Sequence, residues 1–184
     1  MAMNLIFRFF FNILKNLIFK RPMEINETSI ISMRVLPTDL DLNFHMNNGR
    51  YLTIMDIGRT ELVIRSGLHK LVIAEKLSAV ASGININFFK PLAPLEKYEL
   101  HTSVLTWDES WFYLKQEFIK DNQIKASAIA KVIFLKKGKR VKPDYLLKKM
   151  GKEVSPPKAP EYFQSMLNSE KGMINLVKEF NKKS

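Results

Sequence analysis

The order in which strand and helix patterns follow one another constrains the fold of this chain most strongly. One strand pattern, residues 28–35, precedes a long helical pattern, residues 48–66. Alternating apolar residues then predict four further strands, at residues 77–89, 98–107, 111–120 and 124–136. Short polar turns join the last three strands, so they form two successive hairpins and an antiparallel meander. The sequence therefore predicts an α+β domain.

The helical pattern also indicates where the helix lies. Residues 48–66 have helical spacing, with Leu52, Met55, Ile57, Leu62 and Ile64 apolar, and Gly67 gives a plausible end. An antiparallel sheet of about five strands, curved around this one long helix, would bury those side chains. Such a sheet leaves its edge strands exposed. When two copies of the chain pair their edge strands, one edge of each sheet is covered. We therefore expect a homodimer.

Composition narrows the possible functions. The chain has 184 residues, 46% of them hydrophobic, and no cysteine, which excludes a disulfide scaffold, a thiolate zinc site and a cysteine nucleophile. Its net charge of +11 divides into +4 in residues 1–21, −1 in residues 22–135 and +8 in residues 136–184. The neutral body contains no nucleic-acid motif, so we expect no nucleic-acid partner.

The N-terminal residues 1–21 have the pattern of an amphipathic helix. Apolar residues recur at helical spacing, and Arg8 and Lys15 interrupt the run before it is long enough for an uncharged membrane span. An apolar helix with a cationic stripe is typical of a helix in a membrane interface. We therefore expect a cytoplasmic protein, peripheral on the membrane. The helix could instead dock on its own domain or on a partner subunit, and a short tilted span is the third alternative.

The C-terminal residues 143–184 are basic, contain several prolines and show two short helical patterns. We expect a helical extension there, which leaves residues 22–142 as the central domain. The densest basic cluster, residues 136–142, precedes this extension. It could bind a CoA phosphate, the acidic surface of an acyl carrier protein, or anionic lipid.

The loop before the long helix, residues 39–51, combines several functional side chains. Asn47 or Asn48 can cap the helix, and the N–H groups of Asn48 and Gly49 would then point toward the loop. These donors and the helix dipole could hold a carbonyl oxygen as it becomes an oxyanion. Asp41 and His45 lie close enough to act on a water or on the carbonyl carbon. The arrangement suits acyl transfer to water, although such residues also form ordinary turns and caps.

This loop resembles that of a known family. The run from Asp39 to Tyr51 resembles the signature of hotdog-fold thioesterases, including the 4-hydroxybenzoyl-CoA thioesterase group. The pattern Asp41-x-Asn43-x-His45-x-Asn47-Asn48 is similar to the active-site stretch of plant acyl-ACP thioesterases. Residues 107–116 resemble the membrane-associated thioesterase superfamily member 6 branch, in the segments Trp107-Asp108-Glu109 and Trp111-Phe112-Tyr113 and in Gln116. The resemblance covers about residues 28–150 and implies the hotdog fold.

The resemblance also assigns roles to residues. It implies that Asp41 attacks the thioester carbonyl or activates water, and that Asn43 and His45 position groups and transfer protons. It implies that the N–H of Asn48 or Gly49 polarises the thioester oxygen. The expected substrate-binding residues are Asn47, Asn48, Gly49 and Asp56, the last in a supporting role on the helix.

Two departures accompany the resemblance. Phe44 stands where many relatives have a glycine, and the cysteine proposed for the plant enzymes has no counterpart. The expected function is hydrolysis of acyl-CoA or acyl-ACP in lipid metabolism, with no metal or other cofactor. The alternative is a non-catalytic acyl-lipid-binding or membrane-scaffolding hotdog protein. A hotdog dehydratase fits less well, because the loop offers a dense Asp-Asn-His set rather than one histidine paired with a helix acid.

Overall fold

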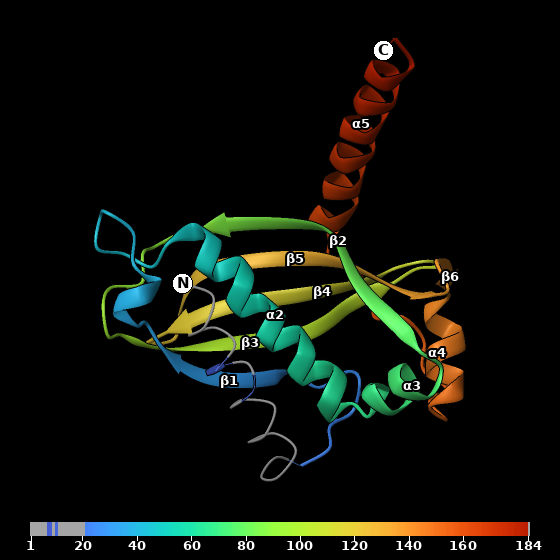
Figure 1. Cartoon of the computed structure of the whole chain (residues 1–184), viewed down its shortest axis with the longest axis horizontal. Helices are drawn as coiled ribbons and strands as arrows, with labels where there is room; N and C mark the ends of the chain where they lie inside the picture. Colours follow the sequence, from blue (N-terminus) through green and yellow to red (C-terminus); the bar gives the residue numbers. More distant parts are fainter. Residues whose placement is uncertain (1–6, 9, 11–20, 184) are drawn as a thin grey trace.

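A computed structural model describes residues 7, 8, 10 and 21–183 of the chain (Figure 1). The expected amphipathic helix, residues 1–21, therefore lies almost wholly outside the described residues. The strands are β1 (Ser29–Arg34), β2 (Leu77–Phe88), β3 (Lys97–Trp107), β4 (Phe112–Lys120), β5 (Gln123–Lys136) and β6 (Lys139–Val141). The helices are a 3-10 turn (Pro37–Asp39), α2 (Asn48–Arg65), α3 (Leu68–Ala74), α4 (Pro143–Lys149) and α5 (Glu161–Lys183).

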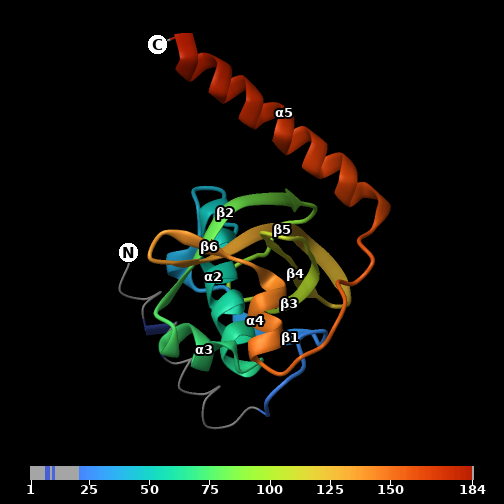
Figure 2. The same cartoon turned by 90° about the vertical axis from the view of Figure 1, so that its right-hand side faces the viewer.

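All the strands form one antiparallel sheet with the order β1-β3-β4-β5-β2, and β6 pairs with β5. The sheet curls around α2, as Figures 1 and 2 show. The predicted meander of β3, β4 and β5 is confirmed, with Asp121 and Asn122 at positive φ in the second turn. The chain connects β1 and β2 through α2 and α3, yet these two strands occupy opposite edges of the sheet.

Helix α2 lies against the concave face of the sheet, so the expected fold class, a curled antiparallel sheet with one long helix, is confirmed. Its residues Tyr51, Ile54 and Met55 are buried in the main core. Gly58 lies where the helix comes closest to the sheet. A Cβ atom at Gly58 would lie 2.5 Å from the hydroxyl oxygen of Thr102 and 2.7 Å from Leu100 Cδ2. Only a glycine allows this close approach.

Helix α2 ends at Arg65, and Gly67 follows two residues later as the predicted end signal, with a φ of 83° that a residue with a side chain rarely adopts. The expected number of strands was about five, and the structure adds the short sixth strand β6. This strand follows a turn with Lys137 and Gly138 at positive φ. Its three residues, Lys139–Val141, are too few and too basic for an apolar alternation to reveal them.

The C-terminal extension contains two helices of very different length. Helix α4 has 7 residues, and α5 has 23 residues rather than the short helix that the pattern predicted. Polar residues and Gly172 interrupt the apolar pattern in the middle of α5, which makes it read as shorter than it is. Among the described residues, no helix is both long enough and apolar enough to cross a membrane.

Candidate active site

The loop before α2 is anchored by Asp39. Its carboxylate is fully buried, accepts a hydrogen bond from the backbone N–H of Leu36 at 2.9 Å, and forms an ion pair with Arg8 at 2.7 Å. The guanidinium of Arg50 lies 3.8 Å away. Asp39 therefore holds the loop in place and does not face solvent.

Asp41 forms the next turn of the loop. One oxygen, Oδ1, accepts hydrogen bonds from the backbone N–H groups of Asn43 at 2.8 Å and His45 at 3.3 Å. The backbone N–H of Asp41 donates to the carbonyl oxygen of His45 at 2.9 Å, which closes the turn. Phe44, at the tip, has a φ of 57°, the left-handed conformation for which glycine is suited. The other carboxylate oxygen, Oδ2, has no hydrogen-bond partner within the described chain.

Asn47 caps α2. Its side-chain oxygen accepts the backbone N–H of Gly49 at 2.8 Å, and its own N–H donates to the carbonyl oxygen of Asp39 at 2.8 Å. Of the two expected oxyanion donors, the Gly49 N–H is therefore already used by the cap. The N–H of Asn48 has no acceptor among the residues that the structure describes, and it lies at the positive end of the helix dipole.

These side chains meet at a groove of about 330 Å³. Asp41, Asn43, His45 and Asn48 line one side of it, as the sequence predicts. The expected residues Asn47 and Gly49 do not line the groove, because they form the cap behind it. The structure thus brings the three expected catalytic side chains together with one unused backbone donor.

The opposite side of the groove comes from residues to which sequence reasoning assigned no role. Phe88, at the end of β2, and the following residues Phe89, Lys90 and Pro91 form this wall. The backbone N–H of Met46 donates to the carbonyl oxygen of Leu92 at 2.9 Å and ties the loop to this segment. The contact depends on the long-range pairing of β2 with β5, for which the sequence carries no local signal.

Tyr51 closes the floor of the groove. It is buried, with its ring packed edge-on against Phe88 at 5.0 Å and Phe118 at 4.7 Å between ring centroids. Burial raises the pKa of Tyr51 to about 12, so the hydroxyl remains protonated at neutral pH. Tyr51 therefore adds an aromatic floor without adding charge.

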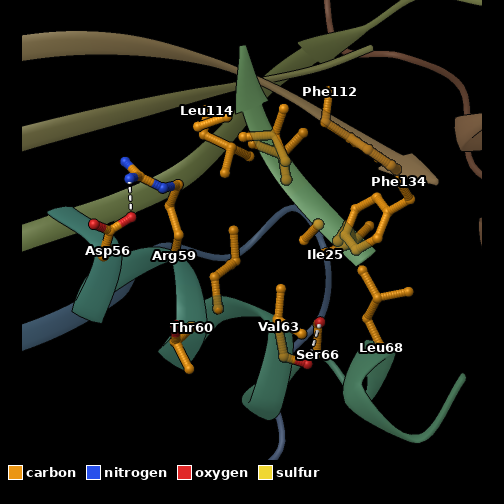
Figure 3. Close-up of a pocket in the computed structure, with 15 residues that line it drawn as sticks. Ile25, Asp56, Arg59, Thr60, Val63, Ser66, Leu68, Phe112, Leu114 and Phe134 are labelled. Carbon is orange, nitrogen blue, oxygen red and sulfur yellow. Dashed lines mark hydrogen bonds and ion pairs between the residues drawn. The ribbon is translucent and has the colours of Figure 1, made fainter. Parts of the chain in front are cut away.

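A second cavity, of about 230 Å³, lies between α2 and β2 (Figure 3). Its walls are mainly apolar and include Val63, Leu68, Phe112 and Phe134. Ala79 and Ala81 of β2 complete it on the edge of the sheet. The cavity is suited to an apolar group rather than to a charged one.

Asp56 lies at this second cavity and not at the groove. It follows Asn48 by slightly more than two helical turns, about 12 Å along the axis. Its carboxylate forms an ion pair with Arg59, as Figure 3 shows, and Arg59 donates to Oε1 of Gln116 at 2.7 Å. Gln116 is fully buried and donates to the carbonyl oxygen of Met55 at 2.9 Å and to the Thr102 hydroxyl at 3.1 Å. The structure therefore does not bring Asp56 together with Asp41.

The basic cluster of residues 136–142 borders a concave surface of about 580 Å³, together with Glu75 and Tyr145. Lys136 pairs with Glu75 at 2.9 Å, and this hydrogen bond lowers the pKa of the Glu75 carboxyl. Lys137, Lys139 and Lys142 have no carboxylate partner in the described part of the chain. Across residues 7, 8, 10 and 21–183, no group of three or more histidine, aspartate or glutamate side chains is placed to hold a metal ion.

Comparison with known proteins identifies relatives of this chain. Residues 35–167 match the family described as the Thioesterase-like superfamily. Protein THEM6 of Xenopus laevis is 35% identical over 130 residues, covering 69% of this chain and 61% of the relative. Protein THEM6 of Danio rerio is 37% identical over 100 residues, covering 54% of this chain and 50% of the relative. The chain thus spans only about half to three-fifths of the length of these relatives.

Solved structures share the fold at low sequence identity. The probable thioesterase YbaW of Escherichia coli has a TM-score of 0.60 and 22% identity, covering 66% of this chain and 94% of that protein. A gentisyl-coenzyme A thioesterase has a TM-score of 0.57 and 19% identity, covering 66% of this chain and 98% of that protein. A Staphylococcus aureus protein determined in complex with CoA has a TM-score of 0.58 and 11% identity, covering 77% and 94%.

Proposed function

Because this chain belongs to the thioesterase-like superfamily and has the hotdog fold, we propose that it hydrolyses acyl thioesters, with CoA as the favoured carrier. The observation that carries the proposal is the groove at the start of α2. There the free oxygen of Asp41, the imidazole of His45 and the unused N–H of Asn48 line or border one space. This is the set of groups that hydrolysis of a thioester requires.

In the proposed reaction a water molecule attacks the thioester carbonyl carbon. Oδ2 of Asp41 accepts a proton from that water, since Oδ1 is held by two backbone N–H groups and orients the carboxylate. The carbonyl oxygen becomes an oxyanion, stabilised by the N–H of Asn48. The carbon–sulfur bond then breaks as His45 delivers a proton to the leaving sulfur, while Asn43 orients the water. The proton that Asp41 took from the water passes to His45 through solvent, which restores both groups. The products are a free carboxylic acid and a free thiol.

We propose a homodimer that pairs through β2. This strand is 12 residues long, contains no charged residue and no proline, and forms an open edge of the sheet. A two-fold axis that relates a strand to its own copy reverses its direction. The half of β2 that borders the apolar cavity then lies beside the half of the other β2 that borders the groove. The cavity of one copy could thereby receive the acyl chain whose thioester lies in the groove of the other.

The basic concave surface is our reason for proposing a carrier that contains phosphate groups. Lys137, Lys139 and Lys142 are available to an anion, and the 3′-phosphate and pyrophosphate of CoA offer several negative charges. An acyl carrier protein would present carboxylates to the same surface. No metal or further cofactor enters this proposal, because the attacking water is activated by Asp41.

A cytoplasmic location on a membrane surface is a separate proposal, carried by the amphipathic pattern of residues 1–21. Deleting this segment would also remove Arg8, and the buried carboxylate of Asp39 would lose this ion-pair partner. The sharper variant keeps Arg8 and replaces Leu14 and Leu17 by glutamate. The proposal predicts release from the membrane fraction, with the control variant Asn12→Glu retained there. A double variant that stays in the membrane fraction would contradict it.

A thiol-release assay tests the proposed hydrolysis. The purified chain is given a series of acyl-CoAs of increasing length and the matching acyl carrier protein thioesters. We expect turnover of CoA thioesters with kcat/KM of at least about 10⁴ M⁻¹ s⁻¹ for the preferred acyl group. Acyl-CoA binding without thiol release, measured by calorimetry, would instead establish the non-catalytic acyl-binding alternative. Faster turnover of the carrier-protein thioesters would contradict the preference for CoA.

A further inference from the structure

The first half of α5 is fixed to the outer face of the sheet. The ring of Phe163 is buried and packs edge-on against Tyr113, with 4.7 Å between the ring centroids. Ile129 and the neighbouring side chains Met166 and Leu167 complete this small cluster. The outer face of the sheet therefore sets the direction of the helix over about its first ten residues.

Contacts further along show that α5 reaches the edge strand β2. Lys131 of β5 forms an ion pair with Glu170 at 2.9 Å. The same Glu170 oxygen lies 3.5 Å from the position that a Cβ atom would take at Gly83 of β2. The remaining residues, 171–183, extend about 20 Å at 1.5 Å per residue. They project beyond the β2 edge in both views (Figures 1 and 2).

The apolar face of α5 resumes past this edge, after the charged Glu170. The apolar positions 163, 166, 167, 173, 174 and 177 follow the spacing of one helix face. Phe163 is only 6% exposed, whereas Met173 is 67%, Ile174 41% and Val177 54% exposed. Asn175 and Lys182 lie on the other side of the helix by the same spacing. A stripe that packs on the sheet in its first half is thus uncovered where the sheet ends.

We propose that α5 is a strap that crosses the β2–β2 junction of the homodimer and packs Met173, Ile174 and Val177 on the second copy. This inference depends on the proposed homodimer and not on the catalytic chemistry. Pairing of the two β2 strands would continue the outer surface of the sheet beneath the projecting helix. The uncovered half of the stripe would then pack on the sheet of the second copy, as the first half packs on the sheet of its own copy. Two-fold symmetry makes the contact reciprocal.

The dissociation constant of the full chain, measured by analytical ultracentrifugation without lipid, tests the strap. The double variant Ile174→Ser/Val177→Ser should weaken the dimer at least tenfold, because it removes apolar contacts only in the second half of α5. The matched control Asn175→Ser/Lys182→Ser, on the other side of the same helical segment, should change the dissociation constant by less than about twofold. Circular dichroism checks that both variants keep their helix content.

Thiol protection gives an independent measurement, because the chain contains no cysteine. The strap predicts that Val177→Cys reacts with maleimide at least tenfold more slowly than Asn175→Cys in the dimer, and equally fast after dilution to monomer. A dimer with an unchanged dissociation constant in the double variant and equal thiol reactivity would overturn the strap and leave the homodimer intact. A chain that is monomeric at every concentration would overturn both, without bearing on hydrolysis. Protection of Val177→Cys only with phosphatidylserine vesicles would assign the stripe to a membrane and overturn the strap.

Discussion

The polar groups at the start of α2 differ from those near its middle in whether they have hydrogen-bond partners. At its start, Oδ2 of Asp41, the imidazole of His45 and the N–H of Asn48 have no hydrogen-bond partner in the described chain and border a groove. Near its middle, Arg59, Gln116 and Thr102 satisfy one another, and Gln116 is fully buried. A polar group with a partner stabilises the fold, whereas one without a partner is available to a substrate. Substitutions at the start should therefore change activity, and those near the middle should change stability.

The largest expected effect is that of Asp41→Asn on hydrolysis. The asparagine oxygen can still accept the N–H groups of Asn43 and His45, so the turn is retained, but the amide cannot accept a proton from water. We expect kcat/KM to fall by about 10³-fold, within the range for loss of a general base. The free energy of unfolding should change by less than about 0.5 kcal/mol.

Asp39→Asn is the matched control for Asp41→Asn. Asp39 is buried beside Arg8 and Arg50, so neutralising it leaves buried cations without their partner. Stability should fall, and the remaining folded protein should keep far more activity than Asp41→Asn. A larger loss of activity in Asp39→Asn than in Asp41→Asn would contradict the assignment of the chemistry to Asp41.

Gly58→Ala should produce the largest loss of stability. In a solvent-exposed helix this change stabilises by about 1 kcal/mol, but here the new methyl group meets Thr102 and Leu100. We expect a loss of about 3 kcal/mol in urea unfolding, as for other overpacked cores. Gly172→Ala on α5, where nothing lies within 4 Å, is the control and should stabilise or leave the chain unchanged. Equal stability of both variants would show that α2 does not approach the sheet this closely.

Gln116→Leu should destabilise the chain by about 2 kcal/mol, because the carbonyl of Met55 and the guanidinium of Arg59 lose a buried partner. Activity of the folded protein should fall much less than for Asp41→Asn. Urea unfolding and the thiol-release assay measure the two quantities on one preparation. Gln123→Leu, at the exposed turn between β4 and β5, is the control with an expected change below about 0.5 kcal/mol. A Gln116→Leu variant that is stable but inactive would place Gln116 in the chemistry.

The smallest expected effect is that of Phe44→Gly. Phe44 adopts a left-handed conformation and its side chain is 72% exposed, so little packing is lost when glycine relieves the backbone. We expect a gain of about 0.5 kcal/mol, the difference between relieved strain and the greater chain entropy of glycine. Phe44→Ala, which keeps the strain, should be no more stable than the wild type in the same unfolding experiment. Destabilisation by glycine would mean that the aromatic ring itself holds the loop.

Much of the site at the start of α2 could be predicted from the sequence. Asp41, Asn43, His45 and Asn48 are close in sequence, so turn and capping chemistry brings them together without knowledge of the remaining fold. The order of the major strands and the long helix follows from apolar periodicity in the same way. The separation of Asp56 from Asn48 along the helix follows from the predicted start of α2. The cavity that Asp56 borders could not be predicted, because strands far away in the sequence form its other walls.

Features that depend on long-range pairing were not predictable. The far wall of the groove, Phe88 to Pro91, faces the loop only because β2 crosses to the edge beside β5. The close packing of Gly58 on the sheet could not be predicted, because the strand that faces it is not known from the sequence. The sequence predicts a shorter helix than α5, because polar residues and Gly172 interrupt the apolar pattern in the middle of the helix. These features follow from tertiary packing rather than from local preference.

The proposed hydrolysis requires that the groups at the start of α2 act as one catalytic unit. The most direct test is kcat/KM of the double variant Asp41→Asn/His45→Ala beside the two single variants, with the preferred acyl-CoA. If both residues act on one water and one leaving group, the double variant should be less than about threefold slower than Asp41→Asn alone. Multiplication of the two single losses, or near-wild-type turnover by Asp41→Asn, would contradict the claim.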